Sequence, residues 1–181
     1  MNKVKFYKNY VFCFFSRNGG ASEKDFSSLN CAFKKGDFDQ NVKKNRMLAS
    51  YKLNKKNIIL PNQTHSNIVL KVTKNLEYKQ SADAIITNRD DYLLGVLTAD
   101  CAPIVVLGEK NYGIIHAGWK GLINGILENT INKLLSLGEK ESNLNVFVDP
   151  HLKKKSFEIK DDFIMMLKKK IKDYEEFIIK K

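Results

Sequence analysis

Residues 83–118, DAIITNRDDYLLGVLTADCAPIVVLGEKNYGIIHAG, form the stretch that decides the fold. Four short apolar runs lie within it, at 83–87, 92–98, 103–108 and 112–118, and Asn, Asp and Gly residues separate them. Runs of this length and β-branched composition are typical of strands buried on both faces of a sheet. We therefore predict that this stretch supplies the centre of a largely buried sheet.

The segments on either side follow other patterns. Upstream, residues 39–53 have the apolar spacing of an amphipathic helix, with Asp39 as a possible cap. Downstream, the period becomes that of helices at 119–136, which Gly138 is placed to end, and at 160–178. The remaining expected strands are at 3–8, 10–15, 57–60, 67–72 and 145–149. This order does not fit a clean βαβ repeat, so we predict an α+β fold in which helices flank a mixed, buried β-sheet core.

Length and composition indicate one globular domain, which we assign to residues 1–181. Apolar residues make up 43% of the chain, enough to close a core, yet no apolar run approaches the ~20 residues of a membrane span. The N-terminus mixes lysines with aromatics, unlike a secretory signal. The three cysteines are too few for a disulfide framework. We therefore expect a cytoplasmic protein with no membrane partner.

The chain is strongly basic, with a net charge of +11, which raises the alternative of nucleic-acid binding. The basic residues are mostly lysines spread along the sequence, as on solvated faces. Arginine, the residue that contacts bases and phosphates through a bidentate fork, occurs only at Arg17, Arg46 and Arg89. We therefore expect no nucleic-acid partner, although the positive field would help to attract an anionic substrate such as phosphate.

Two histidines and one cysteine lie beside the expected strands. His65 is in the polar turn PNQTHSN, Cys101 follows the run LLGVL, and His116 ends the run YGIIHAG. Two imidazoles and a thiolate suit zinc in tetrahedral geometry, and three protein ligands leave a fourth position open, as in catalytic sites. Because 36 and 15 residues separate the three, their spacing alone is weak support. The alternative is that Cys101 is a buried thiol and the histidines are polar residues near the core.

Three other side chains are candidates for the chemistry. Asp100 adjoins Cys101 and suits a general acid–base or a partner of a metal ligand, or else a turn residue. Gln63 lies two positions before His65 and would donate to a substrate. Arg17, in FFSRNGG, adjoins a glycine-rich turn at a strand end and suits an anion clamp, or else is a surface arginine.

The chain resembles the laccase-domain family, once called multicopper polyphenol oxidases and now regarded as purine nucleoside phosphorylases of the YfiH type. The resemblance runs from about residue 11 to about residue 158. The matching segments, in order, are FFSRNGGASEKDFSSLNCAFKKGD, NVKKNRMLAS, PNQTHSNIV, ADAIITN, LGVLTADCAPIVV and IIHAGWKGLINGILENTI. Several such segments in the right order make the match specific, and it implies a YfiH-like fold related to cysteine hydrolases.

The resemblance also implies a site and an activity. The family binds zinc through the Q-x-H, A-D-C and H-A-G-W segments, which here place the ligands at His65, Cys101 and His116. A single Cys and two His lack the many histidines of a multicopper cluster, so zinc is expected in preference to copper. The implied reactions are phosphorolysis of purine nucleosides, including methylthioadenosine, and deamination of adenosine.

Substrate residues follow from the same segments. Arg17 is implied to lie near the phosphate and ribose, and we expect it to bind phosphate together with Lys120, beside the backbone of Gly118. Asp100 and Gln63 fall on family positions near the metal, and Asp100 would carry protons during deamination. Purine nucleosides and phosphate are thus the expected partners, and the protein is expected to be a monomer or homodimer.

The sequence departs from the family in three places. Lys120 replaces the usual arginine after Gly-Trp, and the segment VDPHLKKKSFEI lacks the family's paired cysteines. Relatives continue for several strands past the position of Lys181, so the resemblance implies that the C-terminal strands are missing here. Two alternatives therefore stay open: a hydrolase with Cys101 as nucleophile and His116 as base, and a truncated zinc-binding module without turnover.

Overall fold

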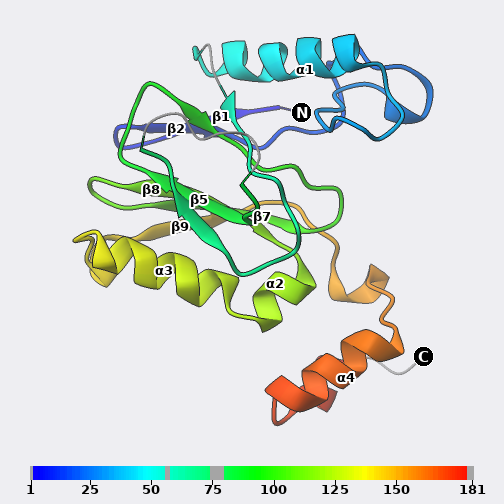
Figure 1. Ribbon diagram of the computed structural model, residues 1–181, viewed down its shortest axis with the longest axis vertical. Coiled ribbons are helices and arrows are strands. Elements are labelled where there is room, and N and C mark those ends of the chain that lie inside the picture. Colours follow the sequence, from blue (N-terminus) through cyan, green and yellow to red (C-terminus); the bar gives the residue numbers. More distant parts are fainter. Residues whose placement is uncertain (1, 56–57, 74–79, 179–181) are drawn as a thin grey trace.

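The computed structural model describes residues 2–55, 58–73 and 80–178 of the chain. It has a layered α+β architecture, shown in Figure 1, with a central sheet between two helical layers. Two helices, α2 and α3, cover one face of the sheet. A hairpin and helix α1 lie over the other face, and helix α4 lies beyond α2, apart from the sheet. The predicted fold class is confirmed.

The central sheet has five strands in the order β4-β5-β8-β7-β9. Strands β4 and β5 pair in parallel, whereas β5–β8, β8–β7 and β7–β9 are antiparallel, so the sheet is mixed as predicted. Strands β5, β7 and β8 come from the stretch 83–118 and form the middle of the sheet. The strands span Val69–Lys71 (β4), Ala84–Thr87 (β5), Ala102–Leu107 (β7), Tyr112–Ala117 (β8) and Asn145–Val148 (β9).

The second layer is built from small sheets and one long helix. Strands β1 (Val4–Tyr7) and β2 (Tyr10–Cys13) form an antiparallel hairpin, and β3 (Ile58–Ile59) pairs in parallel with β6 (Leu93–Leu94). Helix α1 spans Asp39–Lys52 and confirms the helix predicted there. Its N-cap is Phe38, so the expected capping role of Asp39 is wrong: Asp39 is already the first helical residue.

The helix predicted at 119–136 is interrupted. It consists of α2, Trp119–Ile123, and α3, Ile126–Ser136. Gly125 lies between them with φ +88°, a left-handed conformation that glycine adopts at little cost and that ends the first helix. Gly138 has φ +90° and donates its N–H to Leu135, so it ends α3 as predicted.

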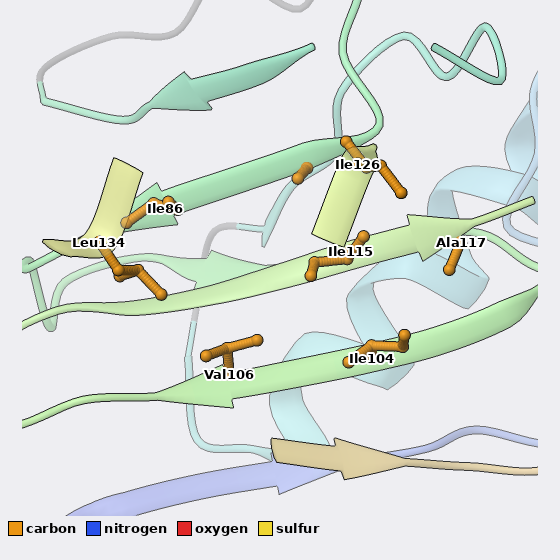
Figure 2. Close-up of a cluster of buried hydrophobic side chains, with 8 residues drawn as sticks. Ile86, Ile104, Val106, Ile115, Ala117, Ile126 and Leu134 are labelled. Carbon is orange, nitrogen blue, oxygen red and sulfur yellow. The ribbon is translucent and has the colours of Figure 1, made fainter. Parts of the chain in front are cut away.

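The main hydrophobic core lies between α3 and the central sheet. Figure 2 shows Ile104 and Val106 of β7 and Ile115 of β8 beneath Ile126 and Leu134 of α3. All five side chains are at most 5% exposed. Because side chains alternate along a strand, the neighbouring residues of β7 point to the opposite face, where they meet the aromatic side chains of the hairpin.

Two further expectations need correction. The run 92–98 forms only the two-residue strand β6, so Cys101 does not follow a long strand; it immediately precedes β7. The expected helix 160–178 is helix α4, Asp161–Lys170, followed by the separate 3-10 helix η4, Tyr174–Phe177. Among the described residues, no helix is long and apolar enough to cross a membrane.

Candidate metal centre

The side chains of His65, Cys101 and His116 meet at one end of the central sheet. One potential ligand atom from each residue lies within 4.8 Å of those of the other two. The Sγ of Cys101 is 3.8 Å from Nε2 of His65, and the two imidazole rings are 4.8 Å apart between centroids. The structure thus brings together the three residues that the sequence analysis selected.

The topology explains why these three residues meet. His116 is the last residue but one of β8, and it pairs with Pro103 near the start of β7. Cys101 lies two residues before Pro103 and so reaches the same end of the sheet. Asp83 is the residue before β5, and its carbonyl accepts the N–H of His116. His65 belongs to the loop that leads into β4, the strand next to β5.

The donor set suits a zinc ion, and the Cys101–His65 separation is close to that of two zinc ligands. Bonds of ~2.0–2.1 Å to nitrogen and ~2.3 Å to sulfur in a tetrahedron place ligand atoms roughly 3.3–3.7 Å apart. The separation of 3.8 Å between Cys101 and His65 is close to this range. Nδ1 of His116 is bonded to Asp83, which leaves its Nε2 as the ring atom for a metal. Two imidazoles, one sulfur and an open fourth position are the pattern of a catalytic zinc site.

Gly118 leaves the space that these ligands occupy. A Cβ atom at this position would lie 2.6 Å from Cδ2 of His65 and 3.2 Å from Sγ of Cys101. Substrate contact by the backbone of Gly118 stays a prediction; in the structure Gly118 lies directly against the side chains of His65 and Cys101.

Asp83 is a buried carboxylate that the sequence analysis did not select as a site residue. Its side chain is fully buried and accepts a hydrogen bond of 2.7 Å from Nδ1 of His116. It also accepts the backbone N–H groups of residues 64, 65 and 66 and the hydroxyl of Ser66. A charged residue between Ala82 and Ala84, at the start of an apolar run, is the sequence signal that was available.

Burial and nearby charges set the pKa values of the site. Burial and the neighbouring His116 lower the pKa of His65, which favours the neutral imidazole that metals bind. Burial, and then Asp100 and Asp83, raise the pKa of the Cys101 thiol. Burial alone would raise the pKa of Asp83, but the hydrogen bonds from His116, Ser66 and the backbone outweigh it and lower that pKa.

A groove of about 1470 Å³ lies between the hairpin layer and the central sheet. Pro103 lines it and pairs directly with His116, so the groove and the His116 side chain share one face of the sheet. Its walls include Phe12, Phe14 and Leu97. Pockets of ~300–1,000 Å³ hold small ligands, so the groove has ample room for one.

Arg17 and Gln63, two of the other predicted site residues, have different environments. Arg17 lines the groove; its side chain is exposed, and Nε donates to the carbonyl of Ser27 at 2.8 Å. The Gln63 side chain exchanges two hydrogen bonds of 2.7 Å with the backbone of Leu97, so it holds two chain segments together.

Asp100 and Lys120 are both exposed; Asp100 directly precedes Cys101 in the chain, and Lys120 lies four positions after His116. The backbone carbonyl of Asp100 accepts the N–H of Leu152 at 2.9 Å. Lys120 places its ammonium 5.3 Å from the ring centroid of Trp119. Their roles in binding and catalysis stay predictions.

Curated relatives share about a third of the chain's residues over the aligned segments. A purine nucleoside phosphorylase from Aquifex aeolicus is 36% identical over 119 residues, covering 66% of this chain and 57% of that protein. Purine nucleoside phosphorylase YfiH from Escherichia coli is 31% identical over 156 residues, covering 84% of this chain and 63% of that protein. The chain thus spans about three fifths of the length of these relatives.

Solved structures share its fold. A Neisseria meningitidis protein superposes with a TM-score of 0.85 at 25% identity, covering 95% of this chain and 72% of that one. The YfiH protein of Bacillus licheniformis gives a TM-score of 0.84 at 25% identity, covering 92% and 68%. Residues 11–181 match the sequence pattern of the family described as multi-copper polyphenol oxidoreductase laccase. With this match and the shared fold, the chain belongs to that laccase-like family, whose curated members here are named purine nucleoside phosphorylases.

Proposed function

We propose that this chain is a zinc-dependent purine nucleoside phosphorylase that also cleaves methylthioadenosine and deaminates adenosine. The observation that carries the proposal is the convergence of His65, Cys101 and His116 within 4.8 Å, in a chain whose relatives are named purine nucleoside phosphorylases. A cytoplasmic location and a monomeric or homodimeric state stay predictions, as does turnover by a chain of this length.

Phosphorolysis requires a bound phosphate, a bound nucleoside and stabilisation of the leaving purine. A phosphate oxygen forms a bond to C1′ while the bond from C1′ to the purine nitrogen breaks, and the purine takes up a proton. The exposed Arg17 guanidinium at the groove and the Lys120 ammonium would hold the phosphate. The apolar walls of the groove would bind the purine and ribose and exclude water from them.

Deamination of adenosine needs a proton acceptor and donor near the metal. The Asp100 carboxyl adjoins Cys101 in the chain and is exposed, so it can reach a substrate and transfer protons. A zinc ion bound by the three residues would supply Lewis-acid chemistry there. Gln63 would act indirectly, because its amide fixes the backbone of Leu97 at the groove wall.

The alternative of a cysteine hydrolase is less well supported by the local electrostatics. A nucleophilic cysteine normally has a lowered pKa, from a nearby cation or a helix N-terminus. The pKa of Cys101 is raised, by burial and by the carboxylates of Asp100 and Asp83. Its hydrogen-bond contact is with His65, whereas Nδ1 of His116 faces Asp83. A metal ion is the partner that would convert this thiol to a thiolate.

Metal analysis tests the first half of the proposal. We expect about one Zn²⁺ per purified chain, as for a three-ligand site. The variant His116→Ala should lose it, because a chelating site with two ligands binds weakly. His151 is the matched control: it is the third histidine, its Nδ1 contacts the carbonyl of Asp149, and His151→Ala should keep the metal. Metal-free wild-type protein that thiol alkylation inactivates would contradict the proposal and favour the hydrolase.

A nucleoside assay tests the second half. Wild-type protein with inosine or methylthioadenosine and phosphate should release the free purine, and adenosine should also yield inosine. Removal of phosphate should stop purine release but leave deamination. Arg17→Ala should raise the KM for phosphate and leave zinc content unchanged. Zinc-loaded protein without either reaction would indicate a binding module.

A further inference from the structure

The two histidines of the metal centre share one carboxylate. Oδ1 of Asp83 accepts Nδ1–H of His116 at 2.7 Å and the backbone N–H of His65 at 3.0 Å. Oδ2 accepts the N–H and hydroxyl of Ser66 at 2.6 and 2.7 Å and the N–H of Thr64 at 3.2 Å. Every partner of this fully buried side chain is a donor, as an ionised carboxylate requires.

This bonding pattern fixes two properties of the site. Because Asp83 accepts from Nδ1 of His116, the ring proton stays on Nδ1, and the lone pair of Nε2 points away from Asp83. Because Asp83 also binds the backbone of the turn at 64–66, it holds His65 at φ +58°. This left-handed conformation is uncommon for a residue with a side chain and persists where the surroundings impose it.

We propose that Asp83 is the positioning residue of the metal centre, which couples the ring orientation of His116 to the backbone conformation of His65. This inference rests on the metal site of the proposed function, but not on its reaction. Asp83 is not one of the three residues of the metal-binding group, and it acts through the two histidines. The structure therefore assigns it control over metal affinity and over which nitrogen of His116 is the ligand.

A purely structural role would give a different result. Glu139 provides the matched comparison, because it is another buried carboxylate that accepts hydrogen bonds from a turn. Its oxygens bind the N–H groups of residues 109, 110 and 111 and the side-chain amide of Asn111. Glu139 is not part of the metal-binding group. Loss of either carboxylate removes acceptors for backbone donors, so Asp83→Asn and Glu139→Gln should both destabilise the fold.

The test is zinc affinity, measured by competition with a chromophoric chelator. In Asp83→Asn one of the two acceptor oxygens becomes an N–H₂ donor, so either the contacts to His116 and His65 or the backbone N–H contacts of the turn lose their acceptor, and the carboxylate charge is lost in both cases. We expect zinc affinity to fall ~10–100-fold, the usual effect of removing a partner of a metal-binding histidine. Glu139→Gln should stay within about threefold of wild type, and Ser66→Ala, which removes one donor and leaves both histidine contacts, should change little.

Spectroscopy adds a readout that general destabilisation would not move. Co²⁺-loaded wild-type protein should show the intense d–d bands of four-coordinate cobalt and a thiolate charge-transfer band, and Asp83→Asn should alter the d–d bands. Equal losses of affinity in Asp83→Asn and Glu139→Gln, or an unchanged Asp83→Asn, would overturn the inference. Wild-type protein that binds no zinc would instead contradict the proposed function.

A second measurement needs no variant and so does not depend on whether Asp83→Asn folds. In ¹⁵N-labelled, metal-free wild-type protein, long-range ¹H–¹⁵N spectra at neutral pH report the tautomer of each neutral histidine. We expect His116 to carry its proton on Nδ1. A spectrum with the proton on Nε2 would show that Asp83 does not orient this ring, and the inference would fail.

Discussion

At the scale of single residues, the centre depends on an absent side chain as much as on its ligands. Gly118 follows β8 directly and lies against His65 and Cys101, so its lack of a Cβ lets the loop of His65 approach the strand end. Its backbone φ of −76° is ordinary, so conformational freedom is not the reason for glycine here. The reason is space.

Gly118→Ala should therefore damage metal binding. A Cβ placed 2.6 Å from Cδ2 of His65 overlaps that ring and must displace it, so we expect zinc affinity to fall about tenfold or more. Gly138→Ala is the control: it is strained by about 1 kcal/mol at φ +90°, but no heavy atom lies within 4 Å of its Cβ. Chelator competition on both variants decides, and equal zinc affinities in the two would refute the steric argument.

The sequence indicated the ligands for a simple reason. With three histidines and three cysteines in the chain, few combinations of soft donors exist, and the resemblance selected among them. Asp83 was missed because an aspartate before a strand has the same local pattern as a turn residue. Its role depends on partners 17 to 33 positions away, which no local pattern contains.

At the scale of elements, hydrophobic pattern predicted the central strands well. The runs that became β5, β7 and β8 are β-branched and bounded by turn residues, and they form the middle of the sheet. The run 92–98 has a similar composition but forms only β6, since strand pairing depends on neighbours that the run itself does not encode. The prediction of one continuous helix over 119–136 was wrong at Gly125, because the spacing of apolar residues does not indicate where the backbone adopts a left-handed conformation.

Glu139 controls the junction between α3 and the β7–β8 connection. Glu139→Gln should lower the free energy of unfolding by about 1–3 kcal/mol at neutral pH, because hydrogen bonds from the backbone to a carboxylate are replaced by those to a neutral amide. Burial alone would raise the pKa of Glu139, but the donors at residues 109–111 outweigh it and hold that pKa below its ordinary value of 4.5. The stabilisation is therefore complete above pH 4.5 and is lost as the pH falls through the lowered pKa.

Urea unfolding of metal-free protein at pH 7 and at pH 3 checks this prediction. The difference between wild type and Glu139→Gln should be largest at pH 7 and should shrink at pH 3, below the ordinary pKa of 4.5, because the glutamate of the unfolded chain then binds a proton more readily than the folded one. Other carboxylates also titrate in this range, which is why the comparison uses the difference between the two proteins. A difference that grows on acidification would contradict the assigned sign.

At the scale of the whole molecule, the layers are not equally attached. Both faces of the central sheet are covered, whereas α4 lies beyond α2 and apart from the sheet (Figure 1). Aromatic contacts join it to the body: Phe163 of α4 lies edge-on to Trp119 at 4.9 Å and to Phe157 at 5.4 Å between ring centroids. Within α4, Leu167 is the buried residue. This small apolar contact predicts that α4 can detach while the sheet stays folded.

Phe163→Ala should detach helix α4 from the body while the central sheet and the metal centre stay intact. Trp119 is the chain's single tryptophan, so loss of the edge-on contact should shift its fluorescence to the red. Trypsin should cut the lysine-rich segment 153–170 faster, because a detached helix exposes its backbone. Zinc affinity should stay within about threefold, since no ligand of the metal centre lies on α4. Met165→Ala, at a position 59% exposed on the same helix, should change none of these. If Phe163→Ala instead unfolded the central sheet, seen as loss of the β-sheet circular dichroism signal, α4 would be an integral part of the core.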